Sequence, residues 1–196
     1  MPVRLFAAHV RMIAPQRPLR ILLTGRPGCG KTTVVLRTVE LLGRRAAGFY
    51  TAEVREGGTR VGFDVVALHG LRGPLARIGA QGPRVGRYGV DVASFERIGV
   101  RALEAGLVEP GVLLVVDELG KMEFQSARFV ELLPQVFAAA NSVLGTILEA
   151  RHPVADRYRR VEGVEVIRVT AANRDGLPGE LARRLAGAVK GRAEGA

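Results

Sequence analysis

Residues 25–32 have the sequence GRPGCGKT, which fits the pattern G-x-x-x-x-G-K-[ST]. Residues 20–24 before it form an apolar run suited to a buried strand, and residues 33–42 after it have the composition of a helix. A strand, a glycine-rich turn and a helix in this order form a loop that binds phosphate groups. The feature predicts an α/β domain in which the first strand leads directly into an anion site.

The loop contains the side chains and the backbone freedom that a polyphosphate site requires. Its three glycines allow the main chain to fold around an anion, and successive N–H groups at a helix N-terminus favour negative charge. Lys31 is expected to reach the outer phosphates, and the Thr32 hydroxyl is expected to ligate Mg²⁺. The residues predicted to contact a nucleotide here are Gly25, Arg26, Pro27, Gly28, Cys29, Gly30, Lys31, Thr32 and Thr33.

A second apolar run, residues 112–116, ends in Asp117 and Glu118. Such a run is typical of a central parallel strand, and ligands of open α/β sheets bind beyond the C-terminal ends of the strands. Asp117 is therefore predicted to hold Mg²⁺ opposite Thr32, and Glu118 to activate a water molecule for attack on a terminal phosphate. The alternative is that both acids end the strand at the surface and pair with arginines.

Four further side chains each have a functional and a structural interpretation. Lys121 could neutralise phosphate charge or pair with Glu123, and Thr146 could contact the terminal phosphate or be an ordinary buried strand residue. Asn173 could contact the base or ribose, or it could belong to a plain turn. Cys29 is interpreted as a small residue at a variable loop position, with an oxidisable thiol as the alternative.

Alternating and β-branched patterns predict several strands after the first helix. These strands cover residues 49–54, 60–68, 142–148 and 164–169. A turn at residues 56–58 joins the first two as a β-hairpin. Residues 70–90 are rich in Gly, Pro and Arg, and we expect loops there with one short strand near Arg87.

Helical periodicity predicts three more helices. The first begins at Asp91 or Ser94 and runs to about residue 105, and the second covers about residues 126–140 with an interruption or kink near Pro134. The last covers residue 177 to about residue 189. Strands that alternate with helices predict a three-layer α/β fold with a mostly parallel sheet, into which the hairpin is inserted.

A chain of 196 residues has the length of one domain. We expect an N-terminal extension at residues 1–18, a single domain at residues 19–190 and a short tail at residues 191–196. The chain has one cysteine, no signal-peptide pattern and no apolar run of about 20 residues. These features predict a cytoplasmic protein without a membrane span, and a monomer is expected.

The net charge of +10 and the pI near 11 would suit a nucleic acid. The arginines are scattered, however, and aromatic residues make up only 5% of the chain, so a stripe of basic and aromatic residues is missing. Among the 29 basic residues only Lys31, Lys121 and Lys190 are lysines, which indicates a general bias toward arginine. The sequence therefore disfavours a nucleic-acid partner, and its three scattered histidines lack the spacing of a zinc site.

Several segments resemble the thermophile type of P-loop nucleoside-triphosphatases over about residues 20–185. They are residues 25–33, 48–55, 60–63, 85–92, 95–100, 117–123 and 170–175. The resemblance implies a RecA-like P-loop fold with additional antiparallel strands, and slow Mg²⁺-dependent hydrolysis of several nucleoside triphosphates to diphosphate and phosphate. It also implies a second nucleotide-contacting segment made of Val115, Val116, Asp117, Glu118, Leu119, Gly120, Lys121 and Met122.

Two other classes of protein are compatible with a phosphate loop. A P-loop kinase would transfer the phosphoryl group to a small acceptor, and such kinases often carry a lid where this chain has Arg151, Arg157, Arg159 and Arg160. A nucleotide-gated binding module would use hydrolysis to time an RNA or protein partner, with the net charge as its support. The candidates for an arginine that stabilises transition-state charge are Arg26, Arg97, Arg128 and Arg174.

Overall fold

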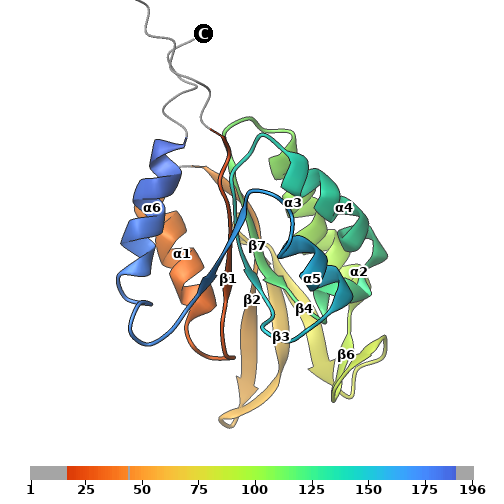
Figure 1. The fold of residues 1–196 in the computed structure, drawn as a ribbon. Helices are drawn as coiled ribbons and strands as arrows, with labels where there is room; N and C mark the ends of the chain where they lie inside the picture. Colours follow the sequence, from red (N-terminus) through yellow and green to blue (C-terminus); the bar gives the residue numbers. More distant parts are fainter. Residues whose placement is uncertain (1–16, 44, 189–196) are drawn as a thin grey trace, which may run out of the picture.

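The computed structural model describes residues 17–43 and 45–188 (Figure 1). The predictions for the tail at residues 191–196 and for most of the N-terminal extension lie outside the described residues, as does Lys190. Within the described ranges, no helix combines the length and the apolar character that crossing a membrane requires.

Five strands form the parallel half of one sheet. They are β1 (Arg20–Thr24), β2 (Ala46–Glu56), β7 (Leu113–Leu119), β8 (Val143–Ile147) and β9 (Val164–Arg168). Their order across the sheet is β2-β7-β8-β1-β9, and every neighbouring pair in this half is parallel. Helices α1 (Lys31–Leu42) and α6 (Leu177–Gly187) pack together on one face (Figure 1).

The opposite face carries a second helical layer (Figure 1). Its helices are α2 (Val92–Phe95), α3 (Arg101–Leu107), α4 (Ala127–Ala138) and α5 (Pro153–Tyr158). A π-helical turn, Glu96–Val100, joins α2 to α3. Asp91 caps this segment, as predicted, because its side chain accepts a hydrogen bond from the Ser94 N–H at 2.8 Å. Helices on both faces of the sheet confirm the predicted three-layer α/β architecture.

Beyond β2 the sheet becomes antiparallel. The added strands, in order from β2, are β3 (Thr59–Ala67), β4 (Arg72–Ile78), β6 (Tyr88–Val90) and β5 (Arg84–Val85). Strands β2 and β3 form the predicted hairpin, with Gly57 and Gly58 in its turn. The expectation of loops at residues 70–90 is wrong for the first part of that segment, because β4 extends the hairpin into a meander.

Tertiary contacts explain why β4 forms from residues that indicate turns in isolation. A Cβ on Gly73 would lie 2.6 Å from Ile98 Cδ1, so glycine at this position lets the helical layer approach the strand closely. Asp64 on β3 pairs with Arg72 and Arg77 on β4. These cross-strand ion pairs stabilise a pairing that local sequence alone does not predict.

Helix α4 runs from Ala127 to Ala138 with Pro134 inside it, so of the interruption or kink expected there, the interruption is wrong. The proline removes one backbone donor, but one face of the helix is buried on the sheet and offsets that loss. The buried residues are Phe129, Leu132, Leu133, Val136 and Phe137. Helix α5 was not expected, and Tyr158 at its end packs on Phe137 with 4.7 Å between ring centroids.

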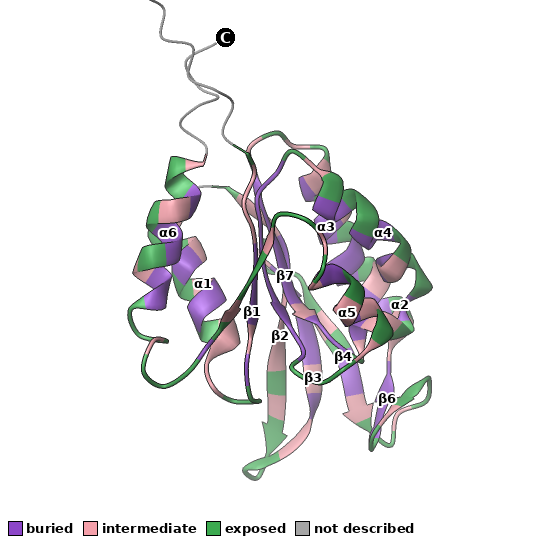
Figure 2. Cartoon of the chain, viewed as in Figure 1, coloured by how far each residue is buried: buried purple, intermediate pink, exposed green. Residues whose placement is uncertain are grey.

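An aromatic cluster links the sheet to this helical layer. Phe49 of β2, Phe95 of α2 and Phe129 of α4 are fully buried and pack edge to face, with ring centroids 5.2–5.9 Å apart. Buried residues follow the central strands and the inward sides of the helices (Figure 2). This core fixes the positions at which β7 and β8 end, and the candidate site lies at those ends, beside the middle of β2.

Candidate functional site

The phosphate loop connects β1 to α1 with the backbone geometry that an anion site needs. Gly25, Gly28 and Gly30 have φ values of 143°, 77° and 104°, which residues with a Cβ rarely adopt. Helix α1 begins at Lys31, directly after the last of these glycines, so its N-terminus faces the loop. Lys31 Nζ donates a hydrogen bond to the Gly25 carbonyl at 3.1 Å, which keeps the ammonium group beside the loop.

Asp117 lies near the end of β7 and is 1% exposed. The Thr146 hydroxyl on neighbouring β8 donates a hydrogen bond to Asp117 Oδ1 at 2.5 Å. Thr146 does not line the pocket at this site. Its hydroxyl therefore orients the acid, which is a different role from a contact with the terminal phosphate.

The second oxygen of Asp117, Oδ2, is buried and has no hydrogen-bond partner among the described residues. Burial raises the pKa of Asp117 above its ordinary value. This rise is opposed in part by hydrogen bonds from the Thr146 and Thr32 hydroxyls and by the positive charge of Lys31. A buried carboxylate oxygen without a donor is costly unless a cation completes its surroundings. The alternative that the two acids pair with arginines at the surface is wrong for Asp117.

The donor set fits Mg²⁺ rather than an all-protein metal cage. The described part of the chain contains no cluster of three or more His, Cys, Asp or Glu side chains arranged to hold a metal ion. Mg²⁺ is usually bound by one or two carboxylates together with substrate phosphates and water. The unpaired oxygen of Asp117 and the nearby Thr32 hydroxyl match that pattern.

Glu118 follows Asp117 and lines the pocket in front of the phosphate loop. Burial raises the pKa of Glu118 above its ordinary value, the Lys31 charge opposes this rise, and Asp117 adds to it. A carboxylate with a raised pKa is a stronger base than a fully solvated one, which suits proton abstraction near neutral pH.

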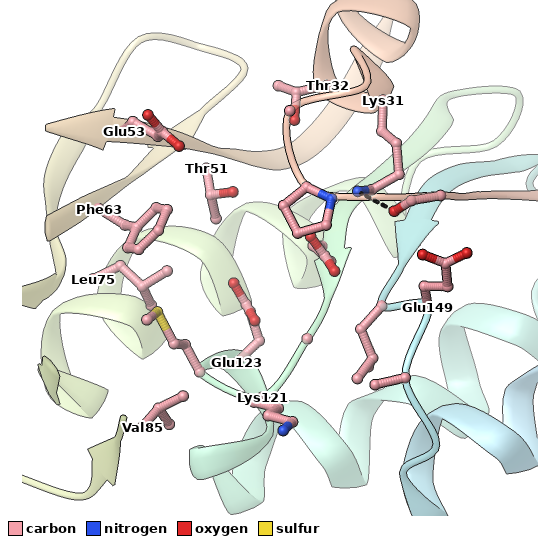
Figure 3. Close-up of a pocket in the computed structure, with 18 of the residues that line it drawn as sticks. Lys31, Thr32, Thr51, Glu53, Phe63, Leu75, Val85, Lys121, Glu123 and Glu149 are labelled. Atoms are coloured by element: carbon pink, nitrogen blue, oxygen red, sulfur yellow. Dashed lines mark hydrogen bonds between the residues drawn. The ribbon is translucent and has the colours of Figure 1, made fainter. Parts of the chain in front are cut away.

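The pocket has a volume of about 850 Å³ and extends from the phosphate loop to the antiparallel strands (Figure 3). This volume lies within the range of about 300–1,000 Å³ typical of small-molecule sites. The predicted site residues that line it are Gly25, Pro27, Gly28, Gly30, Lys31, Thr32, Thr33, Glu118, Gly120, Lys121 and Met122. The structure therefore brings the loop and the segment after β7 together around one cavity.

Other predicted contact residues lie outside the lining of this pocket. Arg26 is an exposed loop residue, Asp117 lies behind the lining, and Val115, Val116 and Leu119 are buried in β7. Cys29 packs against the core beneath the loop, with its Sγ 3.0 Å from the position of a Cβ on Gly25. Its place in the core agrees with the interpretation as a small loop residue.

Asn173 is also outside the pocket. Its Oδ1 accepts a hydrogen bond from the Thr170 N–H at 2.8 Å, and its Nδ2 donates to the Arg168 carbonyl at 2.9 Å. Both polar groups of the side chain are thus used in closing the loop between β9 and α6. This geometry favours the turn interpretation of Asn173.

The candidate arginines lie in different surroundings. Arg26 belongs to the loop itself, and Arg174 lies beside it, with its Cδ 3.7 Å from the position of a Cβ on Gly30. Arg128 pairs with Glu104 in the helical layer, and Arg97 lies near Ser94. In the basic segment after β8, Arg151 and Arg159 both pair with Asp156 of α5, and Arg157 lies over the Tyr158 ring. These arginines stabilise α5, and none of them lines the pocket.

The far half of the pocket consists of residues that the sequence did not single out. Its residues come from the antiparallel strands and from the segment after β7: Thr51, Glu53, Arg60, Phe63, Leu75, Val85, Tyr88 and Glu123. Glu123 is 4% exposed and forms no ion pair with Lys121, so the pairing considered for these residues is absent from the described structure. The resemblance of residues 48–55 and 60–63 to the family segments was the signal that these strands adjoin the site.

A family model described as NTPase matches residues 20–182 of this chain. The nucleoside-triphosphatase THEP1 of Thermotoga petrophila is 44% identical over 164 residues, which cover 83% of this chain and 90% of that protein. The human cancer-related nucleoside-triphosphatase is 41% identical over 173 residues, covering 80% of this chain and 91% of that protein.

A solved structure agrees with these matches. The crystal structure of THEP1 from Aquifex aeolicus has a TM-score of 0.78 and 34% identity, and the alignment covers 85% of this chain and 99% of that one. The matched residues include the phosphate loop, the acid pair and both halves of the sheet, and the P-loop fold that the sequence predicts is thereby confirmed. The chain belongs to the NTPase family of P-loop proteins, among which THEP1 nucleoside-triphosphatases are its relatives.

Proposed function

We propose that the protein hydrolyses nucleoside triphosphates to nucleoside diphosphate and phosphate in the presence of Mg²⁺. The observation that carries the proposal is the buried, unpaired Oδ2 of Asp117, next to Glu118 and opposite Lys31 and Thr32. The names of the related nucleoside-triphosphatases support the same reaction.

Different residues bind the triphosphate and accept the proton. The N–H groups of the loop bind the phosphates, and Lys31 exchanges the Gly25 carbonyl for phosphate oxygens. Thr32 and Asp117 would hold Mg²⁺, which supplies charge neutralisation on the outer phosphates. Glu118 accepts a proton from a water molecule as that water bonds to the terminal phosphorus and the bond to the diphosphate breaks.

A broad choice of base is part of the proposal. Neither Asn nor Gln, whose side-chain amides can form paired hydrogen bonds with a base edge, lines the described pocket. The Asn173 amide is already bonded within its own loop. These features support recognition through the triphosphate, with little discrimination between bases.

The direct test measures phosphate release from ATP, GTP, CTP and UTP across a Mg²⁺ titration, with Asp117→Asn as the paired variant. We expect turnover of all four nucleotides to require Mg²⁺, and the variant to need more Mg²⁺ for half-maximal rate because it loses a charged ligand. Unchanged Mg²⁺ dependence in Asp117→Asn would contradict the metal assignment. Release of pyrophosphate in place of phosphate would contradict the proposed reaction.

A further inference from the structure

The pocket continues past the acid pair into a compartment that a triphosphate bound at the loop would leave open. Its walls are Phe63 of β3, Leu75 of β4, Val85 of β5 and Met122, with Glu123 between these apolar side chains and the loop (Figure 3). We call these five residues the distal compartment. The Phe63 ring packs edge to face on Tyr88 with 5.5 Å between centroids, which holds the apolar wall in place.

Glu123 is the polar group of the distal compartment. It is nearly fully buried, and no described side chain donates a hydrogen bond to its carboxyl group or pairs with it. Burial and the nearby Glu118 raise the pKa of Glu123 well above its ordinary value, and only the backbone N–H groups of Glu123 and Gly120 oppose the shift. A buried carboxyl group without a side-chain partner, facing a cavity, is available to a ligand.

Gly120 brings the two glutamates together. A Cβ at this position would lie 2.6 Å from Glu123 Oε2 and 3.3 Å from Glu118 Cγ, so glycine makes room for both side chains. The distal compartment therefore adjoins the group that is proposed to act as the base. An alcohol bound there with its hydroxyl toward the loop would place that hydroxyl between Glu118 and the terminal phosphate.

The charges around the compartment limit what it can bind. Glu53 pairs with Arg60 at 2.9 Å and with Arg55 at 2.7 Å, so its negative charge is neutralised. The remaining carboxyl groups, Glu118 and Glu123, are close together, and Lys121 is exposed at the rim. A phosphate or carboxylate on the ligand would add another negative charge beside these acids. The compartment therefore suits a neutral or cationic molecule with an apolar body.

The direction of the nucleotide supports a separate occupant. If the terminal phosphate lies between Lys31 and Glu118, which both line the pocket, we expect the rest of the nucleotide to extend back over the loop, away from β3 and β4. The apolar wall then has no contact with the nucleotide, and Phe63 and Leu75 come from strands that contribute nothing to the phosphate loop.

We propose that the distal compartment binds a neutral or cationic alcohol with an apolar body, and that this alcohol competes with water as the phosphoryl acceptor. The inference rests on the proposed function, because it uses the same triphosphate site and the same base. The acceptor oxygen bonds to the terminal phosphorus, and the bond from that phosphorus to the diphosphate oxygen breaks. The diphosphate keeps the electron pair, and the hydroxyl proton passes to Glu118.

The test uses ATP labelled at the terminal phosphate and a fixed panel of probes. The neutral and cationic probes are benzyl alcohol, 2-amino-1-phenylethanol, adenosine and uridine, and the anionic contrasts are mandelate and uridine monophosphate. We expect at least one neutral or cationic probe to become labelled and to raise ADP formation about tenfold or more, because an oriented hydroxyl reacts as an intramolecular partner. The anionic contrasts should remain unlabelled.

Two variants locate the effect in the molecule. Phe63→Ala removes the apolar wall and should abolish labelling of the probe. Ile78→Ala, on the exposed end of β4 and outside the pocket, is the matched control and should behave as the unmodified protein in both assays. Thermal unfolding of each variant establishes that it is folded.

The outcomes separate this inference from the proposed function. Phosphate release without labelling of any probe would overturn the acceptor compartment and leave hydrolysis intact, whereas no phosphate release at all would overturn the proposed function. The acceptor proposal would also be contradicted if Phe63→Ala labelled the probe as well as the unmodified protein does, or if the anionic probes were preferred. A raised KM for ATP in Phe63→Ala would show that the nucleotide itself occupies the apolar wall, and the inference would fail.

Discussion

The proposed role of Glu118 as the base requires an ionised carboxylate, and the surroundings of Glu118 oppose ionisation. Burial and Asp117 raise its pKa, and the Lys31 ammonium lowers it only in part. When the terminal phosphate of a substrate draws Lys31 away from the Gly25 carbonyl, the balance of charge around Glu118 changes. At the scale of single residues, the pKa of Glu118 therefore depends on the charges of Asp117, Lys31 and the substrate phosphate in a poorly solvated pocket.

Replacing Glu118 with Gln tests its role as the base. We expect kcat to fall by about 10²-fold or more, the usual contribution of a general base, while nucleotide binding is retained. Because the pKa of Glu118 is raised, turnover of the unmodified protein should decline as pH falls through a value above that of an ordinary glutamate. The pH profile of kcat measures this, and a Glu118→Gln variant that keeps the same acidic decline would assign it to another group.

Thr146→Val tests whether this threonine acts through Asp117. Loss of the hydroxyl leaves Asp117 Oδ1 without its donor, and outer-shell changes of this kind typically reduce metal affinity or activity about 10–100-fold. The Mg²⁺ concentration for half-maximal rate should rise, and Thr146→Ser should restore it. If Thr146→Val raises the KM for ATP at saturating Mg²⁺ and leaves the Mg²⁺ titration unchanged, the threonine contacts the nucleotide instead.

At the scale of elements, strand β2 connects the two halves of the sheet. It pairs in parallel with β7 through residues 46–49 and antiparallel with β3 along most of its length. Gly48 permits the parallel contact, since its φ is 118° and a Cβ there would lie 2.0 Å from the Val115 carbonyl oxygen. The same contact aligns β2 with β7, whose end carries both acids of the site.

Gly48→Ala should therefore destabilise the protein severely, by about 4 kcal/mol or more, because backbone strain and a backbone clash act together. Gly57→Ala is the matched control: its φ of 53° is also positive, but the space around it is open, so the cost should be about 1 kcal/mol. Denaturant unfolding of both variants measures the difference. Similar costs at the two positions would show that the approach of β2 to β7 can relax.

At the scale of the whole molecule, part of the positive charge is held in local ion pairs, and a net charge of +10 remains. Arginines pair with acids in several parts of the fold: between β2 and β3, between β3 and β4, between α3 and α4, and between α6 and β9. Examples are Arg60, Arg77, Arg128 and Arg184. Pairs of this kind use the arginines in contacts within the fold, and exposed ones add little stability. Arginines used in such pairs are less available to a nucleic-acid backbone, and the sequence disfavours a nucleic-acid partner.

We accordingly expect duplex DNA and single-stranded RNA to leave ATP turnover within about twofold of its basal rate at low salt, where electrostatic binding is strongest. Turnover assays with and without nucleic acid, together with binding measured at two salt concentrations, check this. If nucleic acid stimulates ATP turnover and high salt removes the stimulation, the result would favour the nucleotide-gated binding module as the function.

The features that depend on local backbone chemistry could be predicted from the amino-acid sequence. The phosphate loop, the strand before it and the helix after it follow from three glycines, a lysine and a threonine at fixed spacing, because neighbouring residues set this geometry. The positions of Asp117 and Glu118 were predictable as well, since a solid apolar run indicates a central strand and the residues directly after such a strand lie at the sheet edge.

The meeting of distant side chains, in contrast, is a property of the tertiary structure. The burial of Glu123, the bond from Thr146 to Asp117 and the apolar wall around Phe63 each join segments far apart in the chain. Strand β4 forms because Gly73 lets a distant helix approach and because Asp64 pairs with Arg72 and Arg77. Local patterns carry no information about such contacts, because burial and charge pairing are set by whatever the rest of the fold places nearby.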